Sequence, residues 1–358
     1  MNNNTTRGEN LMQKTKVYYR GCLIGGAIGD ALGWPVEFMS LEEIRSKYGD
    51  NGINTLVIGG RGRAEISDDT QMTLFTAEGL LRAETRAYNK GVSEISKCVY
   101  NAYLRWLYTQ GDLTDGTLDI YDGYLIKQKE LYVKRVPGIT CLTALRNKEI
   151  GTVDNPINDS KGCGCVMRVA PVGLFYRPQF AFKKGMECAA ITHGHVYGQL
   201  SAGAFSYIIS SIISGMDISD AVEDALIELS KYYNSDDIID ILKKATTLSL
   251  SKKSDEVCIK ELGEGWIAEE ALAIAVFSAL RYKGDFERAV IAAVNHSGNS
   301  DGTGAMTGNI LGTYLGINKI PKKWTSKLEL SDVIIRIADD LLIGYSDEGE
   351  WWIKYPGY

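Results

Sequence analysis

The sequence has few of the residues that build zinc sites or disulfide frameworks. Its 358 residues include three histidines and seven cysteines, an odd number. No two cysteines have the Cys-x-x-Cys spacing and no histidine completes a zinc pattern, which excludes a structural zinc site of the usual kind. Free thiols are typical of a reducing compartment and predict a cytoplasmic protein. No apolar run approaches the ~20 residues that a membrane-spanning helix needs.

Positive charge is also in the minority, since 39 Lys and Arg stand against 45 Asp and Glu, for a net charge of −6. This balance argues against nonspecific binding to nucleic acid or to an anionic membrane. Hydrophobic residues make up 45% and charged residues 23%, as in an ordinary globular protein. Residues 1–16 are polar and lack the apolar core of a signal peptide, so we expect a polar tail followed by one domain over residues 17–358.

Helical periodicity dominates the chain, whereas strict alternation of apolar and polar residues is scarce. There is no βαβ rhythm, and the pattern predicts an all-α fold. Gly304, Gly308, Gly312 and Gly316 recur every four residues on one helix face and predict the close approach of another helix backbone. Helical segments are predicted at 70–85, 92–108, 199–214, 218–232, 236–250, 267–282, 286–295 and 331–345.

Two acidic segments come directly before predicted helices. Ser67, Asp68 and Asp69 precede the first, and they form either a helix N-cap or a hard-metal site with oxygen ligands. Asn299 and Asp301 precede the glycine-striped helix, and the same two interpretations apply. If the two helix starts face each other at one end of a bundle, their oxygens predict a Mg²⁺ or Mn²⁺ site.

A glycine-rich loop and a few isolated polar residues are further candidates. The segment 162–168 (GCGCVMR) offers backbone amides and the Arg168 side chain to a phosphate, although a tight turn before a helix explains the pattern equally well. His193 and His195 are two residues apart and would not share a helix face, so they form no zinc motif. Glu37 ends an apolar segment and faces either a site or solvent.

Six segments in one order make the chain resemble the ADP-ribosylglycohydrolase family, of the dinitrogenase-reductase-activating type, from about Tyr18 to Tyr345. The segments are GCLIGGAIGDALGWPVEF, SDDTQMTLFTAEGLL, SKGCGCVMRVAPVGL, THGHVYGQLSAGA, GWIAEEALAIA and NHSGNSDGTGAMTGNILGTYLG. The resemblance implies a single orthogonal multi-helix domain that binds two Mg²⁺ or Mn²⁺ ions. It also implies hydrolysis of the N- or O-glycosidic bond at the anomeric carbon of ADP-ribose.

The resemblance further assigns roles to individual positions. It implies metal ligands at Ser67, Asp68, Asp69, Asn299, Asp301 and Thr303. It implies catalytic carboxyl groups at Glu37, Asp68, Asp69 and Asp301, and one of the first three would accept a proton from the attacking water. The loop that holds the diphosphate would be Gly162, Cys163, Gly164, Cys165, Val166 and Met167, with His193 close to the substrate.

Two positions depart from the family pattern. Asn299 stands where the family usually has aspartate, and Gly302 stands where it usually has serine or threonine. The first change removes a charge and the second removes a hydroxyl, for which Thr303 is the nearest replacement. We therefore expect one of the two metal ions to be bound weakly or not at all, and hydrolysis to be reduced.

The leading hypothesis is a metal-dependent hydrolase that removes ADP-ribose from an ADP-ribosylated protein or a small ADP-ribosyl substrate. Arginine-linked ADP-ribose is favoured by the bacterial type of the resemblance. One alternative is a catalytically weakened protein that binds ADP-ribose or an ADP-ribosyltransferase, in the manner of an antitoxin or immunity protein. Another is a glycohydrolase that acts on a different nucleotide-linked substrate. No membrane partner is expected, and nucleic acid is disfavoured by the charge.

Overall fold

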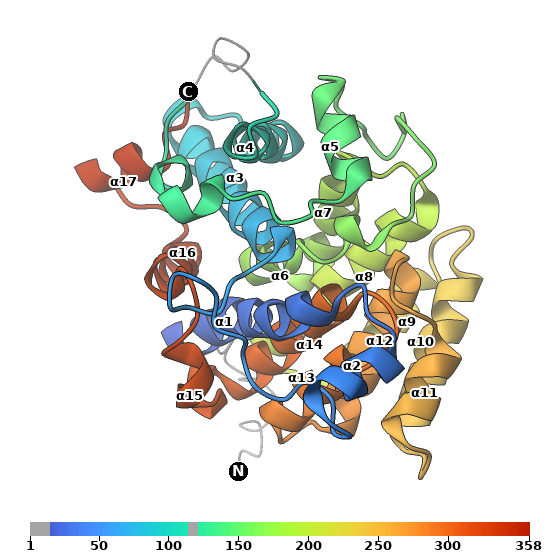
Figure 1. Ribbon diagram of the computed structural model, residues 1–358. Helices are drawn as coiled ribbons and strands as arrows, with labels where there is room; N and C mark the ends of the chain where they lie inside the picture. The colour runs from blue at the N-terminus through green and yellow to red at the C-terminus, as the bar shows by residue number, and fades with distance from the viewer. Residues whose placement is uncertain (1–14, 114–120) are drawn as a thin grey trace, which may run out of the picture.

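The computed structural model describes residues 15–113 and 121–358, which form helices joined by loops (Figure 1). The predicted all-α class is confirmed, because the described part of the chain contains no strand and its pairing is limited to isolated bridges such as Gly162 with Ile267. Most of the predicted tail, residues 1–14, lies outside the described residues. The first helix already begins at Lys16, the last residue assigned to that tail.

The helices follow one another closely along the described residues, and η marks the short 3₁₀ helices among them. In chain order they are α1 (Lys16–Gly33), η1 (Trp34–Val36), α2 (Leu41–Tyr48), α3 (Asp68–Lys90), α4 (Ile95–Thr109), η2 (Leu125–Lys127), η3 (Lys129–Tyr132), α5 (Ile139–Arg146), η4 (Cys163–Cys165), α6 (Ala170–Phe175), α7 (Pro178–Ala190), α8 (Val196–Ile213), α9 (Ile218–Leu229), α10 (Asp236–Ser249), α11 (Asp255–Leu262), α12 (Ala268–Arg281), α13 (Phe286–Val294), α14 (Ser300–Leu315), η5 (Ile317–Lys319), α15 (Lys322–Thr325), α16 (Ser331–Ile343) and α17 (Gly349–Lys354).

Every predicted helical segment overlaps an observed helix, whereas α1, α2, α5, α6, α7, α11, α15 and α17 lie outside the predicted segments. Helix α8 is long and apolar enough to span a membrane by composition alone, but 83% of its residues are buried inside the protein. It is therefore the kind of helix that fills a core. Its neighbours α7 and α9 pack against it, as does α14.

Helices α1 and α14 lie side by side through two matching stripes of glycine (Figure 1). A methyl group added at Gly25 would overlap the carbonyl oxygen of Gly308, so the two backbones touch with no side chain between them. The predicted close approach is confirmed, except that Gly316 ends α14 with a φ of 77° and does not continue the stripe. The contacting pairs are Gly21 with Gly312, Gly25 with Gly308, and Gly29 with Gly304.

The order of these pairs shows that the two helices run antiparallel. The C-terminal end of α1 therefore lies beside the N-terminal end of α14, and a methyl group added at Gly33 would overlap the backbone of Ser300. Because α3 also packs on both helices, its first turn joins the same end of the bundle. The fold thus brings three helix termini together.

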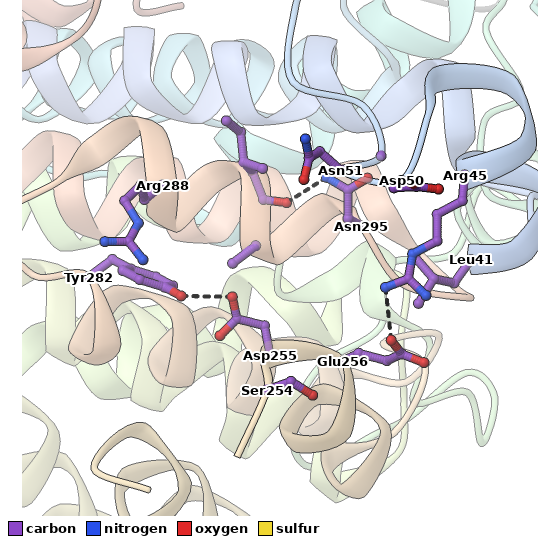
Figure 2. Close-up of a pocket in the computed structure, with 13 residues that line it drawn as sticks. Leu41, Arg45, Asp50, Asn51, Ser254, Asp255, Glu256, Tyr282, Arg288 and Asn295 are labelled. Carbon is purple, nitrogen blue, oxygen red and sulfur yellow. Dashed lines mark hydrogen bonds and ion pairs between the residues drawn. The ribbon is translucent and has the colours of Figure 1, made fainter. Parts of the chain in front are cut away.

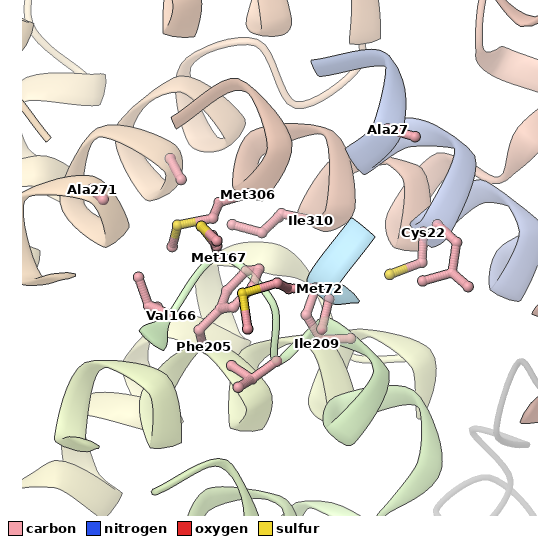
Figure 3. Packing of buried hydrophobic residues seen from close by; sticks show 14 of the residues in the cluster. Cys22, Ala27, Met72, Val166, Met167, Phe205, Ile209, Ala271, Met306 and Ile310 are labelled. Carbon is pink, nitrogen blue, oxygen red and sulfur yellow. The ribbon is translucent and has the colours of Figure 1, made fainter. Parts of the chain in front are cut away.

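Below these termini, an apolar core joins the same elements. Met72 of α3, Met167 after η4 and Met306 of α14 are buried around Phe205 and Ile310 (Figure 3). Methionine is flexible and polarisable, and it fills the irregular space between helices that cross at different angles. The packing fixes the relative positions of α3, the glycine-rich loop and α14.

Candidate active site

The first turn of α3 is held by a carboxylate from another helix. Asp30 of α1 is fully buried, and it accepts hydrogen bonds from the Ser67 amide at 3.0 Å, from the Thr70 amide at 3.2 Å and from the Thr70 hydroxyl. Ser67 additionally caps the helix by accepting from the Asp69 amide. Because Asp30 and Ser67 satisfy these donors, Asp68 and Asp69 need not serve as caps.

Asp30 holds the first turn of α3, and the sequence did not reveal this role. Its partners lie 37 to 40 residues away and are mainly backbone amides, which have no sequence signature. The sequence feature that could have revealed this role is the charge of Asp30 within an apolar, glycine-rich segment. A buried aspartate in such a helix needs hydrogen-bond partners.

Replacing Asp30 by asparagine is expected to destabilise the protein and to weaken cation binding. In the asparagine side chain an NH₂ group replaces one of the two acceptor oxygens. One of the donors on Ser67 or Thr70 would then face another donor and lose its hydrogen bond. The expected loss is roughly 1–3 kcal/mol in the free energy of unfolding. Urea unfolding measures the stability, and calorimetric titration with Mn²⁺ measures the cation affinity.

Glu78→Gln is the matched control, because Glu78 is also a fully buried carboxylate but binds Arg105 at 3.1 Å outside the cavity. It should lower stability and leave Mn²⁺ binding as in the wild type. Wild-type Mn²⁺ affinity in Asp30→Asn would show that Asp30 does not position the acidic residues.

The start of α14 faces the start of α3. The Asp301 carboxylate accepts a hydrogen bond from the Gly302 amide at 2.9 Å, and the Ser67 side chain lies close enough to lower the pKa of Asp301. A methyl group added at Gly302 would lie 3.2 Å from Asp69 Oδ2. The structure therefore brings Ser67, Asp69 and Asp301 together, as expected for two helix entrances that meet at one end of the bundle.

Burial and mutual repulsion raise the pKa values of this acidic cluster. The pKa of Asp301 rises to about 7 through burial and the charge of Asp30, and the pKa of Asp30 rises to about 6 through burial. The pKa of Glu37 rises to about 10 through burial and the charges of Asp301 and Asp68. The pKa of Asp69 is raised well above its ordinary value by burial, Asp301 and Asp68. These groups can all ionise together only if positive charge is brought among them.

The chemistry of the donor set fits a hard divalent cation. Asp69 Oδ2 is buried without a hydrogen-bond partner, and the described residues lining the adjacent cavity include no Lys or Arg. Such an oxygen is costly unless a cation or a proton neutralises it. Within residues 15–113 and 121–358, however, no three His, Cys, Asp or Glu side chains are grouped closely enough to hold a metal ion. A bound cation would therefore have to draw the carboxylates together.

The two departures from the family pattern lie side by side. Asn299 Nδ2 donates to the Gly265 carbonyl at 3.0 Å and to Cys163 Sγ at 2.7 Å, so its amide oxygen is the atom left for a cation. A methyl group added at Gly302 would lie 2.6 Å from the same Nδ2 atom. The Asn299 amide therefore occupies space that a side chain at position 302 would need.

Thr303 is placed differently from what the sequence suggested. Its hydroxyl donates to the carbonyl oxygens of Ala293 and Asn299, and His296 Nε2 lies 2.9 Å away. Threonine in a helix commonly bonds back to the preceding turn in this way. Thr303 is fully buried and does not line the cavity, so the structure does not bring its hydroxyl to the acidic cluster.

A cavity of about 380 Å³ opens over the acidic residues. At its rim the rings of Phe38 and Trp266 are stacked, with centroids 5.7 Å apart. Cys165 and Val166 are fully buried and do not line it, so these two residues of the predicted diphosphate loop offer no side chain to a ligand. The other predicted residues that line it are Glu37, Asp68, Asp69, Gly162, Cys163, Gly164, Met167, His193 and Asn299.

Arg168 does not reach this cavity. Its guanidinium is completely buried, donates to Thr192 Oγ1 at 2.7 Å and to the Cys188 carbonyl at 3.3 Å, and lies 4.4 Å from the centre of the Tyr103 ring. The expectation that its side chain cradles a phosphate is therefore wrong. Any phosphate at this loop would have to bind backbone amides, among which Gly164 has no acceptor in the described part of the chain.

A second cavity of about 340 Å³ lies between α2, α11 and α13 (Figure 2). Arg45 of α2 pairs with Glu256 at 2.8 Å, and the Tyr282 hydroxyl donates to Asp255 at 2.7 Å (Figure 2). The Arg45–Glu256 pair joins α2 to α11, and the Tyr282–Asp255 bond joins the end of α12 to α11.

Comparisons with known proteins agree with this arrangement. The family model for ADP-ribosylglycohydrolase matches residues 12–350. The ADP-ribosyl-[dinitrogen reductase] glycohydrolase of Rhodospirillum rubrum is 24% identical over 87% of this chain and 90% of its own. The ADP-ribosylarginine hydrolase Tri1 of Serratia proteamaculans is 24% identical over 90% of this chain and 78% of its own.

A solved structure described as an ADP-ribosylglycohydrolase-related protein complex has the same fold. It superposes with a TM-score of 0.66 at 22% sequence identity, and covers 93% of this chain and 99% of that one. The resemblance found in the sequence motifs thus extends over nearly the whole chain and over its three-dimensional structure. The protein belongs to the ADP-ribosylglycohydrolase family.

Proposed function

We propose that the protein is a metal-dependent hydrolase that removes ADP-ribose from an ADP-ribosylated acceptor by cleaving the glycosidic bond at the distal ribose. The observation that carries the proposal is the buried acidic cluster at the base of the cavity, with Asp69 Oδ2 unpartnered and the glycine-rich loop alongside. Family membership supplies the reaction class.

An arginine-linked acceptor is the favoured substrate. One relative, matched over 78% of its own length, is an ADP-ribosylarginine hydrolase. At the cavity rim, the stacked rings of Phe38 and Trp266 offer faces on which a guanidinium group can pack. A cationic acceptor therefore matches the rim of the cavity.

The reaction requires a proton acceptor and negative charge near the anomeric carbon. Ser67, Asp68, Asp69, Asp301 and the amide oxygen of Asn299 would hold the cation. A bound Mg²⁺ or Mn²⁺ would supply the positive charge that lets the carboxyl groups ionise and polarises sugar hydroxyls and water. Ionised carboxylates can then accept a proton from water and stabilise the oxocarbenium-like transition state.

The protonation state of Glu37 in this scheme depends on whether a cation is bound. With a pKa of about 10 it carries its proton at pH 7 in the absence of positive charge, and in that state it cannot act as a base. The repulsion from Asp301 and Asp68 that contributes to this pKa falls when a cation neutralises them. We infer that Glu37 becomes a competent base only in the cation-loaded protein.

The decisive experiment is a release assay with arginine-linked and serine-linked ADP-ribosylated proteins, each with Mg²⁺, Mn²⁺ or EDTA. Release of free ADP-ribose from the arginine-linked protein, lost in EDTA, supports the proposal. Faster release from the serine-linked protein would overturn the arginine preference while leaving the reaction class intact. No release from either substrate by protein that binds ADP-ribose would overturn the hydrolase proposal.

The second candidate function is a binder of ADP-ribose or of an ADP-ribosyltransferase with weakened hydrolysis. Asn299 and Gly302 favour it, because the amide nitrogen of Asn299 is engaged by Gly265 and Cys163 and position 302 provides no hydroxyl. In that case one cation site would be too weak to be occupied, and the ligand would be held without being cleaved.

Asn299→Asp combined with Gly302→Ser is expected to tighten binding of a second Mn²⁺ ion and to raise the hydrolysis rate. A Cβ at position 302 would lie 2.6 Å from the terminal nitrogen of Asn299, and aspartate has the same shape, so the side chain at position 299 must turn aside in the double variant. Asn299→Asp alone should lose stability without cation, because a carboxylate would replace the amide donor opposite the Gly265 carbonyl. Titration calorimetry beside the release assay tests both effects. Unchanged stoichiometry and rate in the double variant would show that these positions do not limit the site.

A further inference from the structure

Arg168, Thr192 and His193 form a chain of side chains that runs from the core to the cavity. Arg168 Nη2 lies 2.7 Å from Thr192 Oγ1, and this oxygen lies 2.8 Å from His193 Nδ1. All three residues are buried, and His193 also lines the cavity. The proposed reaction gives no part to Arg168 or Thr192, although a buried guanidinium without a carboxylate partner is a costly feature.

The chemistry of the three groups sets the direction of the hydrogen bonds. Arginine is only a donor, so Thr192 Oγ1 must accept from Arg168. The Thr192 hydroxyl hydrogen then points to another acceptor, either His193 Nδ1 or the sulfur of the nearby Cys141. Sulfur is a weak acceptor and an imidazole nitrogen a strong one, so the hydroxyl donates to Nδ1. A ring that accepts at Nδ1 carries its hydrogen on Nε2.

The surroundings of the ring agree with this assignment. Burial and the positive charge of Arg168 lower the pKa of His193 well below its ordinary value, so the ring is neutral. Methyl groups added at Gly162 and Gly164 would lie 3.6 and 3.5 Å from His193 Nε2. Among the described residues, neither Nε2 nor the Gly164 amide has a hydrogen-bond acceptor. Two free N–H donors therefore flank the glycine-rich loop.

We propose that Arg168 and Thr192 are positioning residues that make His193 a hydrogen-bond donor to an oxygen of the ligand, a phosphoryl or hydroxyl oxygen over the loop 162–164. In this arrangement His193 binds the ligand and does not act as the acid or base of the reaction. The identity of the ligand, ADP-ribose, rests on the proposed function, whereas the position of the imidazole hydrogen does not.

The hydrogen position can be measured directly by NMR of protein with ¹⁵N-labelled histidine. The chain has three histidines, so comparison with His193→Gln assigns the His193 signals. The wild type should show a protonated Nε2 and an unprotonated Nδ1 at neutral pH. Thr192→Ser keeps the hydroxyl and should keep this signature, whereas Thr192→Val keeps the shape and should lose it. A wild-type ring protonated on Nδ1 would overturn the proposal.

Calorimetric titration with ADP-ribose tests the consequence for binding. Loss of one directed hydrogen bond should weaken ADP-ribose binding about tenfold in Thr192→Val, with near wild-type affinity in Thr192→Ser. Thermal unfolding of both variants shows that they are folded, and Arg168→Met should repeat the effect of Thr192→Val. Unchanged affinity in Thr192→Val with an altered tautomer would overturn the positioning role. A wild type that binds no ADP-ribose would refute the proposed function, while the NMR result would still stand.

Discussion

Replacing Asp69 by asparagine is expected to abolish hydrolysis and, at the same time, to stabilise the cation-free protein. Asp69 Oδ2 is buried without a hydrogen-bond partner among the residues that the structure describes, and Asp301 and Asp68 repel it. Asparagine removes the repulsion and also a negative oxygen that a cation needs, so we expect a loss of roughly 10³-fold or more in kcat/KM. The release assay measures the first effect, and thermal unfolding in EDTA the second.

The same variant should change how stability depends on pH. The pKa of Asp301 is raised to about 7 and that of Asp30 to about 6, above their values in the unfolded chain. Through these two groups the folded protein binds more protons than the unfolded chain between about pH 4 and 7, and through Glu37 up to about pH 10, so its stability falls as pH rises through that window. Each unit of raised pKa corresponds to about 1.4 kcal/mol. Asp69→Asn should make this fall shallower, and Mg²⁺ should reverse it in the wild type.

Asp154→Asn provides the control, because it makes the same chemical change at an exposed position. Asp154 lies on the surface of the loop 148–161. It should leave activity, cation response and pH dependence as in the wild type. A lower stability of Asp69→Asn in EDTA, with a Mg²⁺ response equal to that of the wild type, would show that the acidic cluster is not the cation site.

Gly25→Ala is expected to cost at least about 3 kcal/mol in the free energy of unfolding, well above the usual effect of adding one methyl group. The new methyl group would overlap the Gly308 carbonyl, and a backbone atom cannot turn aside as a side chain can. Gly284→Ala is the matched control, since no atom lies within 4 Å of its added methyl group. Urea unfolding compares the two. Equal stability would mean that α1 and α14 can separate without cost.

The parts of the site that have a local sequence pattern could be predicted, whereas the pairing of helices could not. The helix starts at Ser67–Asp69 and Asp301 have recognisable capping chemistry, and the stripe of glycines indicated that a backbone must approach α14. Together they predicted two acidic helix entrances at one end of a bundle. The partner of the stripe was in the sequence as Gly21, Gly25 and Gly29, but nothing in the sequence states which of several small-residue helices it contacts.

The direction of a side chain was the part that the sequence could not provide. Arg168 follows a glycine-rich loop and was expected to face a phosphate, but the chain turns into α6 and places the guanidinium under Tyr103. Thr303 was expected to replace a missing hydroxyl, but in a helix it bonds to the preceding turn. Asp30 was missed because its partners are amides brought close by the fold. In each case the answer depends on tertiary packing and not on local pattern.

The pairing of α1 with α14 also sets the order in which the protein can assemble during synthesis. Asn309 Nδ2 donates to the Cys22 carbonyl at 2.8 Å across 287 residues of sequence. Contacts of such long sequence separation form slowly, because a large loop must close before they are gained. A ribosome must release nearly the whole chain before α14 can cover the bare backbone face of α1. Until then the chain presents an uncovered helix surface to chaperones, and the acidic residues remain dispersed in water. The electrostatic cost of the site is therefore not met before α14 has been synthesised.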